Sequence, residues 1–265
     1  MFTKFKVDSK AIHQLSERCG RIDLIDKTKS EKSFYYDILN VATGNEDIIN
    51  GTKLQHLDFP SMKKEYDVFI SYSHSDENDA LYLASWLNNH CRLTCFLDSI
   101  VWHSADALLK VIDDKYCWQP DSGTYSYKKR NYSTSHVHAM LSMAMHDIIN
   151  RSECCIVIDS DKSFPLKEGI EKCTFSPWIY EEIAFMTHMR PKLPSRYKNL
   201  FSMRLFSTGG QLCEAHNVQQ VKIKYNVDLD MFPSLCGDDI YSLHDGYNAL
   251  ERLYISKQVF SEVHG

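Results

Sequence analysis

The chain has 265 residues, of which 43% are hydrophobic and 25% are charged, as in an ordinary globular protein. Its formal net charge of −5 argues against the basic surface of a general nucleic-acid-binding protein. No apolar run approaches the roughly 18 residues that span a bilayer, and the N-terminus lacks the apolar stretch of a signal peptide. We therefore expect a cytoplasmic protein that binds neither nucleic acid nor a membrane.

The cysteines and histidines give no sign of a disulfide framework or a metal site. The nine cysteines are odd in number and include no Cys-x-x-Cys pair, which is typical of free thiols in a reducing compartment. None of the twelve histidines has metal-ligand spacing with a cysteine. His136 and His138 lie two residues apart, which on a helix points them about 200° away from each other. No metal ligand is predicted.

Residues 1–63 are predicted to form a helical extension. Apolar residues at helical spacing favour one helix near residues 8–18 and another near residues 31–42. The stretch 57–61 then ends regular structure, because Pro60 and the residue before it disfavour a helix.

A different pattern begins at residue 64, where short apolar runs alternate with amphipathic segments. The runs predict buried strands at 66–72, 93–97 and 154–158. The first helix between them follows the possible caps Ser73 and Asp76. Its apolar face comprises Ala80, Leu83, Ala84 and Leu87. The second helix is capped by Ser104, and its apolar positions are Ala105, Leu108, Leu109, Ile112 and Tyr116.

The rest of the chain is assigned by the same signals. Residues 118–134 are predicted to form a long polar loop, and long loops in compact domains are often functional. A third helix follows, with an apolar face of Val137, Met140, Leu141, Ala144 and Ile148. Ser176 and Pro177 begin a fourth helix that runs to about Met189. A strand is expected near 200–206, and a C-terminal extension at 207–265 contains a strand at 221–225 and a last helix capped by Asp238 or Asp239.

Strands that alternate with helices predict an α/β fold with a mainly parallel sheet. In such sheets the ligand crevice lies beyond the carboxyl ends of the strands. The loops 71–76, 98–102 and 159–163 are therefore the expected site, together with the long loop if it folds over the same edge.

Several motifs in this region resemble those of TIR domains, in the same order. Tyr66-Asp67-Val68-Phe69-Ile70-Ser71-Tyr72-Ser73 resembles the first strand, Cys95-Phe96-Leu97-Asp98 the second, and residues 150–160 a later helix end and strand. Ser176-Pro177-Trp178-Ile179-Tyr180-Glu181-Glu182-Ile183 resembles the Trp-x-x-x-Glu segment of the next helix. The similarity is to bacterial TIR proteins, particularly the TIR subunits of Thoeris anti-phage systems. It implies a flavodoxin-like, three-layer domain over residues 64–206.

The resemblance implies an enzyme that takes NAD⁺ as its substrate and cleaves the nicotinamide–ribose bond with an active-site glutamate. It also implies an ADP-ribose-derived signal, an effector that senses this signal, TIR–TIR self-association and a phage-derived trigger. In one place the chain departs from the family pattern. Ser142 stands where many NAD⁺-cleaving TIR domains carry their glutamate, whereas Thoeris-like proteins have a candidate in the Trp-x-x-x-Glu segment, here Glu182.

A single glutamate is chemically sufficient for this reaction. The nicotinamide of NAD⁺ is already cationic and leaves as a neutral molecule, so one carboxylate that stabilises the ribose cation is enough. Trp178, Glu182, Phe185 and Met189 recur at helical spacing, which predicts a partly desolvated carboxylate with a strengthened field. The alternatives are that Glu182 anchors a loop through backbone amides or lies on a solvated face.

The remaining candidates each have a structural alternative. Ser71, Tyr72 and Ser73 bind ribose or phosphate, or serve as turn and cap residues. Asp98 and Ser99 line the crevice, or Asp98 caps a helix. Trp102 stacks on a ring of the substrate, or covers the core. Arg130, with Lys128 and Lys129, contacts the pyrophosphate, or belongs to a solvated loop. Tyr132, His136, His138, Ser142 and Trp178 line the pocket, or pack and cap.

Two other classes of function compete with the enzyme. A non-catalytic TIR assembly module is favoured by Ser142, whereas the long loop and Glu182 favour the enzyme. A phospho-receiver or nucleotide-binding domain is disfavoured, because a receiver needs acidic residues where Ser71-Tyr72-Ser73 stands.

Overall fold

The computed structural model describes residues 1–25, 32–44, 48–59, 65–102, 104–165, 172–194, 197, 224–243 and 246–260. The chain forms two compact units, and each is described here by itself. The first comprises Met1–Ile25, Tyr66–Leu97 and Ile149–Gly265, and the second comprises Asp26–Glu65 and Asp98–Ile148. Both units therefore combine segments that are distant in sequence, whereas three consecutive segments were expected.

The first unit is built on a five-stranded sheet in the order β3-β2-β6-β1-β9. All neighbouring strands are parallel. The predicted parallel α/β sheet is thus confirmed, with a strand at each of the three predicted ranges, of which the third extends one residue further to Asp159. The strands are β1 (Thr3–Asp8), β2 (Val68–Ser71), β3 (Cys95–Phe96), β6 (Cys154–Asp159) and β9 (Ser234–Leu235).

The strand β1 was not predicted, although it pairs with β6 from Thr3↔Cys154 to Asp8↔Asp159. On one face of β1, Phe5 and Val7 are fully buried. On the other face, the ammonium groups of Lys4 and Lys6 donate to the backbone carbonyls of Met186 (3.0 Å) and Leu229 (2.9 Å). These hydrogen bonds satisfy two lysines inside the fold, so a segment expected to belong to a helical extension forms a strand.

The strand order differs in part from the expected flavodoxin-like order, which is 2-1-3-4-5. With β2 counted first, β3-β2-β6 corresponds to its 2-1-3 portion. The fourth place holds β1, which comes from the N-terminus and not from the segment after β6. The N-terminal residues thus complete the sheet beside β6.

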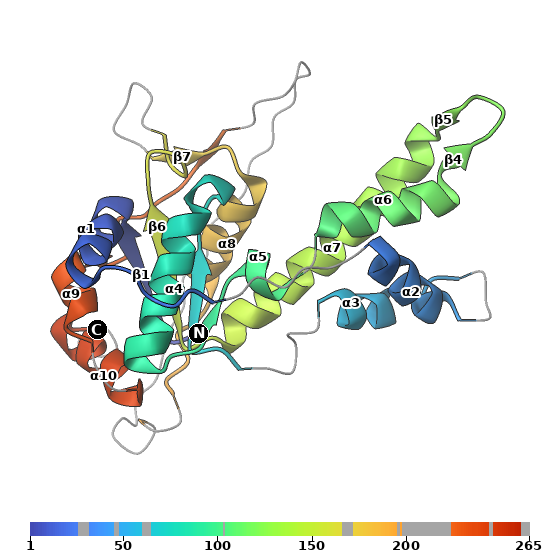
Figure 1. Ribbon diagram of the computed structural model, residues 1–265. Helices are drawn as coiled ribbons and strands as arrows, with labels where there is room; N and C mark the ends of the chain where they lie inside the picture. The colour runs from blue at the N-terminus through green and yellow to red at the C-terminus, as the bar shows by residue number, and fades with distance from the viewer. Residues whose placement is uncertain are drawn as a thin grey trace. The chain divides into compact units, whose positions relative to one another are not determined.

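Helices cover both faces of this sheet. Phe5 stacks on Tyr254 of α10, with ring centroids 6.4 Å apart, whereas its neighbour Lys4 bonds to Met186 of α8. Because adjacent strand residues point to opposite faces, α10 and α8 lie on opposite sides and the unit has three layers. The helix α4 packs against α1 and α10 (Figure 1). The helices of this unit are α1 (Ser9–Cys19), the 3-10 helix η2 (His74–Asp76), α4 (Glu77–Cys91), α8 (Pro177–His188), α9 (Gly237–Tyr241) and α10 (Gly246–Ser256).

Most predicted helices of the first unit are confirmed. The expected inner face of α4 is buried along its whole length. Ser176 caps α8 by accepting a hydrogen bond of 3.3 Å from the backbone amide of Ile179, and Pro177 begins the helix.

The C-terminal segment differs from the prediction. It forms two helices, and the backbone amide of Cys236 donates to Asp239 (2.7 Å), so Cys236 and not an aspartate is the N-cap of α9. The strand expected at 221–225 is represented by β8 (Tyr225–Asn226), which pairs antiparallel with β7 (Cys173–Thr174). The strand expected near 200–206 lies outside the described residues.

The second unit consists of helices and one short hairpin. The helices near 31–42 and after Ser104 are confirmed as α2 and α6, and their apolar faces share a core with α3 and α7. Its elements are α2 (Lys32–Thr43), α3 (Gly51–Asp58), α5 (Asp98–Val101), α6 (Ala105–Tyr116), β4 (Trp118–Gln119), β5 (Thr124–Tyr125) and α7 (Tyr127–Arg151), of which the last residues of α7 belong to the first unit.

The prediction of a long loop at 118–134 is wrong. The hairpin β4–β5 occupies its first half, and α7 begins already at Tyr127 (Figure 1). The ring of Trp118 contacts Tyr125 edge to face, with centroids 5.0 Å apart. The start of α7 escaped prediction because its first turns expose polar side chains, and the apolar periodicity begins only at Val137.

Candidate functional site

The side chain of Glu182 lies on the inner face of α8. This face comprises Ile179, Glu182, Ile183 and Met186, all buried. The expected face was different: Trp178 and Phe185 are only half-buried, and Met189 follows the end of the helix. The correction has a simple cause, since the aliphatic residues one position along the helix bury more completely against the sheet.

A buried hydrogen bond links Glu182 to the sheet. The hydroxyl of Ser71 donates to Oε2 of Glu182 at 2.5 Å, and the two residues are 1% and 7% exposed. Ser71 is the last residue of β2 and is paired with Val157 of β6. Glu182 therefore lies at the carboxyl end of β2, the edge where parallel sheets bind their ligands.

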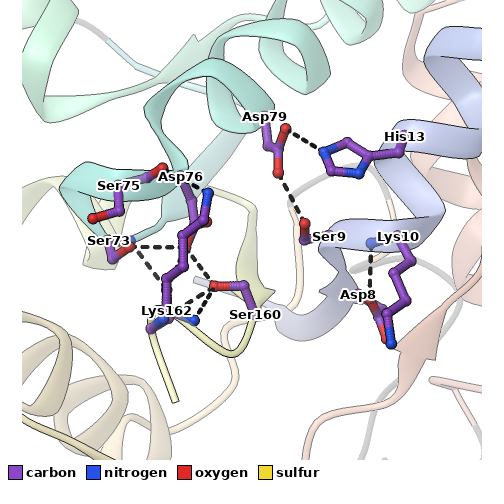
Figure 2. A network of polar contacts seen from close by, with 11 residues as sticks. Asp8, Ser9, Lys10, His13, Ser73, Ser75, Asp76, Asp79, Ser160 and Lys162 are labelled. Atoms are coloured by element: carbon purple, nitrogen blue, oxygen red, sulfur yellow. Dashed lines mark hydrogen bonds and ion pairs between the residues drawn. The ribbon is translucent and has the colours of Figure 1, made fainter. Parts of the chain in front are cut away.

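The loops that follow β2 and β6 meet at the same edge, around the buried carboxylate of Asp76 (Figure 2). Its Oδ2 accepts hydrogen bonds from the hydroxyls of Ser73 (2.8 Å), Ser160 (2.5 Å) and Ser163 (2.8 Å). The ammonium of Lys162 lies 3.4 Å from Oδ1. Burial by itself would raise the pKa of Asp76, but these hydrogen bonds outweigh it and lower the pKa.

The end of β1 adds residues to this edge that the sequence analysis missed. Asp8 is paired in register with Asp159, whose carboxylate contacts the ammonium of Lys172. Asp8 also caps α1 by accepting a hydrogen bond of 2.8 Å from the amide of Lys10 (Figure 2). The alternation Lys-Phe-Lys-Val before Asp8 is the signal that would have predicted a strand here.

A second polar group joins α1 to α4. Asp79 accepts from the hydroxyl of Ser9 (2.9 Å) and lies 3.0 Å from Nε2 of His13 (Figure 2). The imidazole of His13 and the hydroxyl of Ser9 both contact the carboxylate of Asp79, and they do not contact each other. The arrangement therefore lacks the serine–histidine bond that a nucleophilic serine needs.

The predicted site residues divide between the two units. In the first unit, Ser73 belongs to the Asp76 group, where its amide also donates to Ser163 (3.3 Å), and Tyr72 and Trp178 are half-buried. In the second unit, Asp98 begins α5 and accepts a hydrogen bond of 2.7 Å from the amide of Ser99. The Asp98 carboxylate thus contacts the first turn of α5, and its role toward a ligand stays a prediction.

Two predicted ligand residues of the second unit, Trp102 and Arg130, have partners within the protein. Trp102 is 5% exposed and contacts Phe59 edge to face at 5.1 Å between centroids, so it is a core residue and not an open stacking platform. The guanidinium Nε of Arg130 donates to Oδ2 of the buried Asp113 at 2.8 Å. Arg130 lies on α7 and pairs with a carboxylate of α6, as a structural residue would, and its contact with pyrophosphate stays a prediction.

The other candidates of the second unit lie along α7. Tyr132 and His136 contact each other with centroids 4.4 Å apart, and both line a cavity of about 700 Å³. His138 is exposed and Ser142 is half-buried. Neither residue lines that cavity.

The two cysteines of β6, Cys154 and Cys155, are fully buried. Burial raises the pKa of the Cys155 thiol to about 12 and raises that of Cys154 strongly, so both stay protonated near neutral pH. Among the described residues, no group of three or more His, Cys, Asp or Glu side chains is placed to hold a metal ion.

Comparison with family models, curated proteins and solved structures finds no match to this chain. None of the helices in the described ranges has both the length and the apolar character required to cross a bilayer. The conclusions about the site therefore depend on its own geometry. That geometry is a buried carboxylate oriented by a hydroxyl, beside two loops that meet at the carboxyl edge of a parallel sheet.

Proposed function

We propose that the protein is a TIR-type enzyme that cleaves the nicotinamide–ribose bond of NAD⁺, with Glu182 as its charged residue. The observation that carries the proposal is the place of Glu182, which is buried at the carboxyl end of β2 and held there by Ser71. The strand motif that contains Ser71 and the helix motif that contains Glu182 are two of the TIR-like segments, and the hydrogen bond joins them.

The reaction needs only one acidic group. The bond between the ribose C1′ and the nicotinamide nitrogen breaks, and its electron pair stays on nicotinamide, which leaves neutral. The positive charge that develops on the ribose is stabilised by the Glu182 carboxylate, whose field is stronger in a buried site than in water. Water or a ribose hydroxyl then attacks C1′ and gives its proton to solvent, which yields ADP-ribose or a cyclic product.

The fold supports this proposal at the level of architecture. The parallel β3-β2-β6 order is compatible with the 2-1-3 portion of a flavodoxin-like sheet, whereas the N-terminal strand β1 holds the fourth place. We further propose that the protein acts in the cytoplasm, assembles through TIR–TIR contacts and responds to a phage-derived trigger. Its ADP-ribose-derived product would be sensed by a separate effector.

A non-catalytic assembly module is the second candidate, and one observation favours it. Ser142, at the position where many TIR enzymes carry their glutamate, is a half-buried residue of α7. In that case the Ser71–Glu182 bond would serve only to hold α8 on the sheet.

The proposal is tested with the full-length protein and NAD⁺, with nicotinamide measured by chromatography. The same measurement in lysate of phage-infected cells allows for an enzyme that is inactive until triggered. We expect Glu182→Gln to lower the rate by about 10²–10³-fold, the usual effect of removing one electrostatic stabiliser. Glu181→Gln, on the neighbouring half-buried position, is the matched control and should keep the wild-type rate.

Two results would count against the enzyme. One is a Glu182→Gln protein that releases nicotinamide as fast as the wild type. The other is a wild-type protein that stays inactive in infected lysate while its cells remain protected from phage, which would favour the assembly module.

A further inference from the structure

The second unit contains a cavity of about 700 Å³ that the proposed reaction does not use. Its volume lies within the range of small-molecule binding sites, about 300–1,000 Å³. The side chains that line it come from α3, α6, α7 and the residues before α3, so it lies inside one unit.

The deep part of the cavity is apolar. Leu54 of α3, Ile112 of α6 and Val137 of α7 are buried members of the hydrophobic core of this unit. Met140 is partly buried against the same core. A molecule that fills this part must therefore present hydrocarbon, because these walls offer no hydrogen-bonding groups.

The rim of the cavity is cationic. Lys128 and Lys129 line it from the first turns of α7, and both side chains are exposed. Among the described residues, Lys129 contacts the carbonyl of Tyr116 (3.3 Å), and no carboxylate pairs with either ammonium group. The adjacent Arg130, by contrast, is paired with Asp113. The ammonium groups of Lys128 and Lys129 can therefore bind the negative charge of a ligand at the rim of the cavity.

The lining of α7 changes in one direction along the helix. From its N-terminal end it runs from the two lysines through Tyr132 and His136 to Val137 and Met140. Lys129 and Met140 are about 17 Å apart along the helix axis. An amphipathic ligand that lies along this face would place its anionic head at the lysines and its chain in the core.

We propose that this cavity binds a single-chain amphipathic anion, such as a fatty carboxylate or an alkyl phosphate. The apolar floor holds the chain, and Lys128 and Lys129 hold the head through charge-assisted hydrogen bonds. Tyr132, which is 70% exposed, stands between the two regions and covers the upper part of the chain.

The proposal is tested by titration calorimetry of the full-length protein with decanoate and with decyl phosphate. Decanol and acetate serve as ligands that lack the charge or the chain. We expect binding of at least one of the two anions, while decanol and acetate bind at least tenfold more weakly. The tighter of the two anions identifies the headgroup.

Variants of the rim and the floor separate the two parts of the site. The double variant Lys128→Gln/Lys129→Gln should weaken binding of the anion about tenfold, or about 1.4 kcal/mol. Met140→Trp, which fills the partly buried wall, should abolish it. Lys53→Gln, an exposed lysine of α3 outside the lining, should leave it unchanged. If Met140→Trp does not fold, the lysine variants still decide.

Three results would overturn the proposal. The first is equal affinity for the anion in the wild type and the double lysine variant. The second is equal affinity for decanol and decanoate. The third is binding to phosphatidylglycerol vesicles but to neither free anion, which would make the cationic rim a membrane-contact surface and leave the cavity without a ligand.

Discussion

The hydroxyl of Ser71 joins the end of β2 to the middle of α8, because it donates a buried hydrogen bond of 2.5 Å to the carboxylate of Glu182. The two residues are 111 positions apart in the chain. A strand end and a helix face that resemble separate TIR motifs thus form one site. The strength of this link can be measured apart from any catalytic role.

Ser71→Ala should lower the free energy of unfolding by about 1.5–3 kcal/mol, the usual contribution of a hydrogen bond to a charged group. Urea unfolding at neutral pH measures it. Thr187→Val is the control, since this threonine of α8 donates to the neutral carbonyl of Ile183 (2.8 Å) and should cost only about 0.5–1.5 kcal/mol. Equal losses in both variants would mean that the Ser71 bond has no charged character.

The Asp76 group predicts a loss of stability in acid. The pKa of Asp76 is lowered in the folded protein below its ordinary value of 3.8, so its ionised form stabilises the fold. This contribution is present above the unfolded pKa and is lost as the pH falls through the folded one. Between about pH 5 and pH 2, the wild type should therefore lose more stability than Asp76→Asn. Urea unfolding at several pH values measures this difference. If the urea midpoints of the two proteins changed equally with pH, the expectation would be contradicted.

Asp58, at the end of α3, predicts a pH dependence of the opposite sign. Burial raises its pKa from 3.8 to about 7, so the folded state holds a proton that the unfolded state releases. The stability of the wild type should fall as the pH rises from about 4 to about 7, by at most about 4 kcal/mol.

Asp58→Asn removes this titration and should be more stable than the wild type at pH 8, with little difference at pH 4. Thermal unfolding at the two pH values measures both effects. A variant less stable than the wild type at pH 8 would show that the ionised carboxylate is held by favourable contacts.

Arg130 should contribute to folding and not to NAD⁺ binding. Arg130→Ala leaves the Asp113 carboxylate buried with one donor fewer, so the free energy of unfolding should drop by about 1–3 kcal/mol. Lys128→Ala, two positions away and exposed, should change it by less than about 0.5 kcal/mol. A stable Arg130→Ala protein with a raised KM for NAD⁺ would restore the pyrophosphate contact inferred from the sequence.

Local sequence patterns predicted three strands of the sheet but not β1. The apolar runs at 66–72, 93–97 and 154–158 predicted their strands because most of their residues are buried, completely so in β2, and a continuous apolar run can be recognised from the segment itself. β1 carries lysines on a face that packs under α8, and those lysines are tolerated only because carbonyl oxygens of Met186 and Leu229 accept their hydrogen bonds. A pattern of neighbouring residues cannot predict these carbonyl acceptors, because they lie 182 and 223 positions away in the chain.

The candidate site shows the same division. That Glu182 lies on a helix beginning at Ser176 and Pro177, and that Ser71 ends a strand, follows from residue types within a few positions of each. The hydrogen bond between them, the pairing of Arg130 with Asp113 and the burial of Trp102 against Phe59 depend on how separate elements pack.

The amino-acid sequence by itself determined the alternation of strands and helices, the start of α8 and the loops after β2 and β6, because these follow from short-range periodicity and capping. Only the tertiary structure decided that β1 completes the sheet, that α7 replaces a loop and which charges are neutralised. The physical reason is that a buried charge is stable only where a partner from elsewhere in the chain meets it.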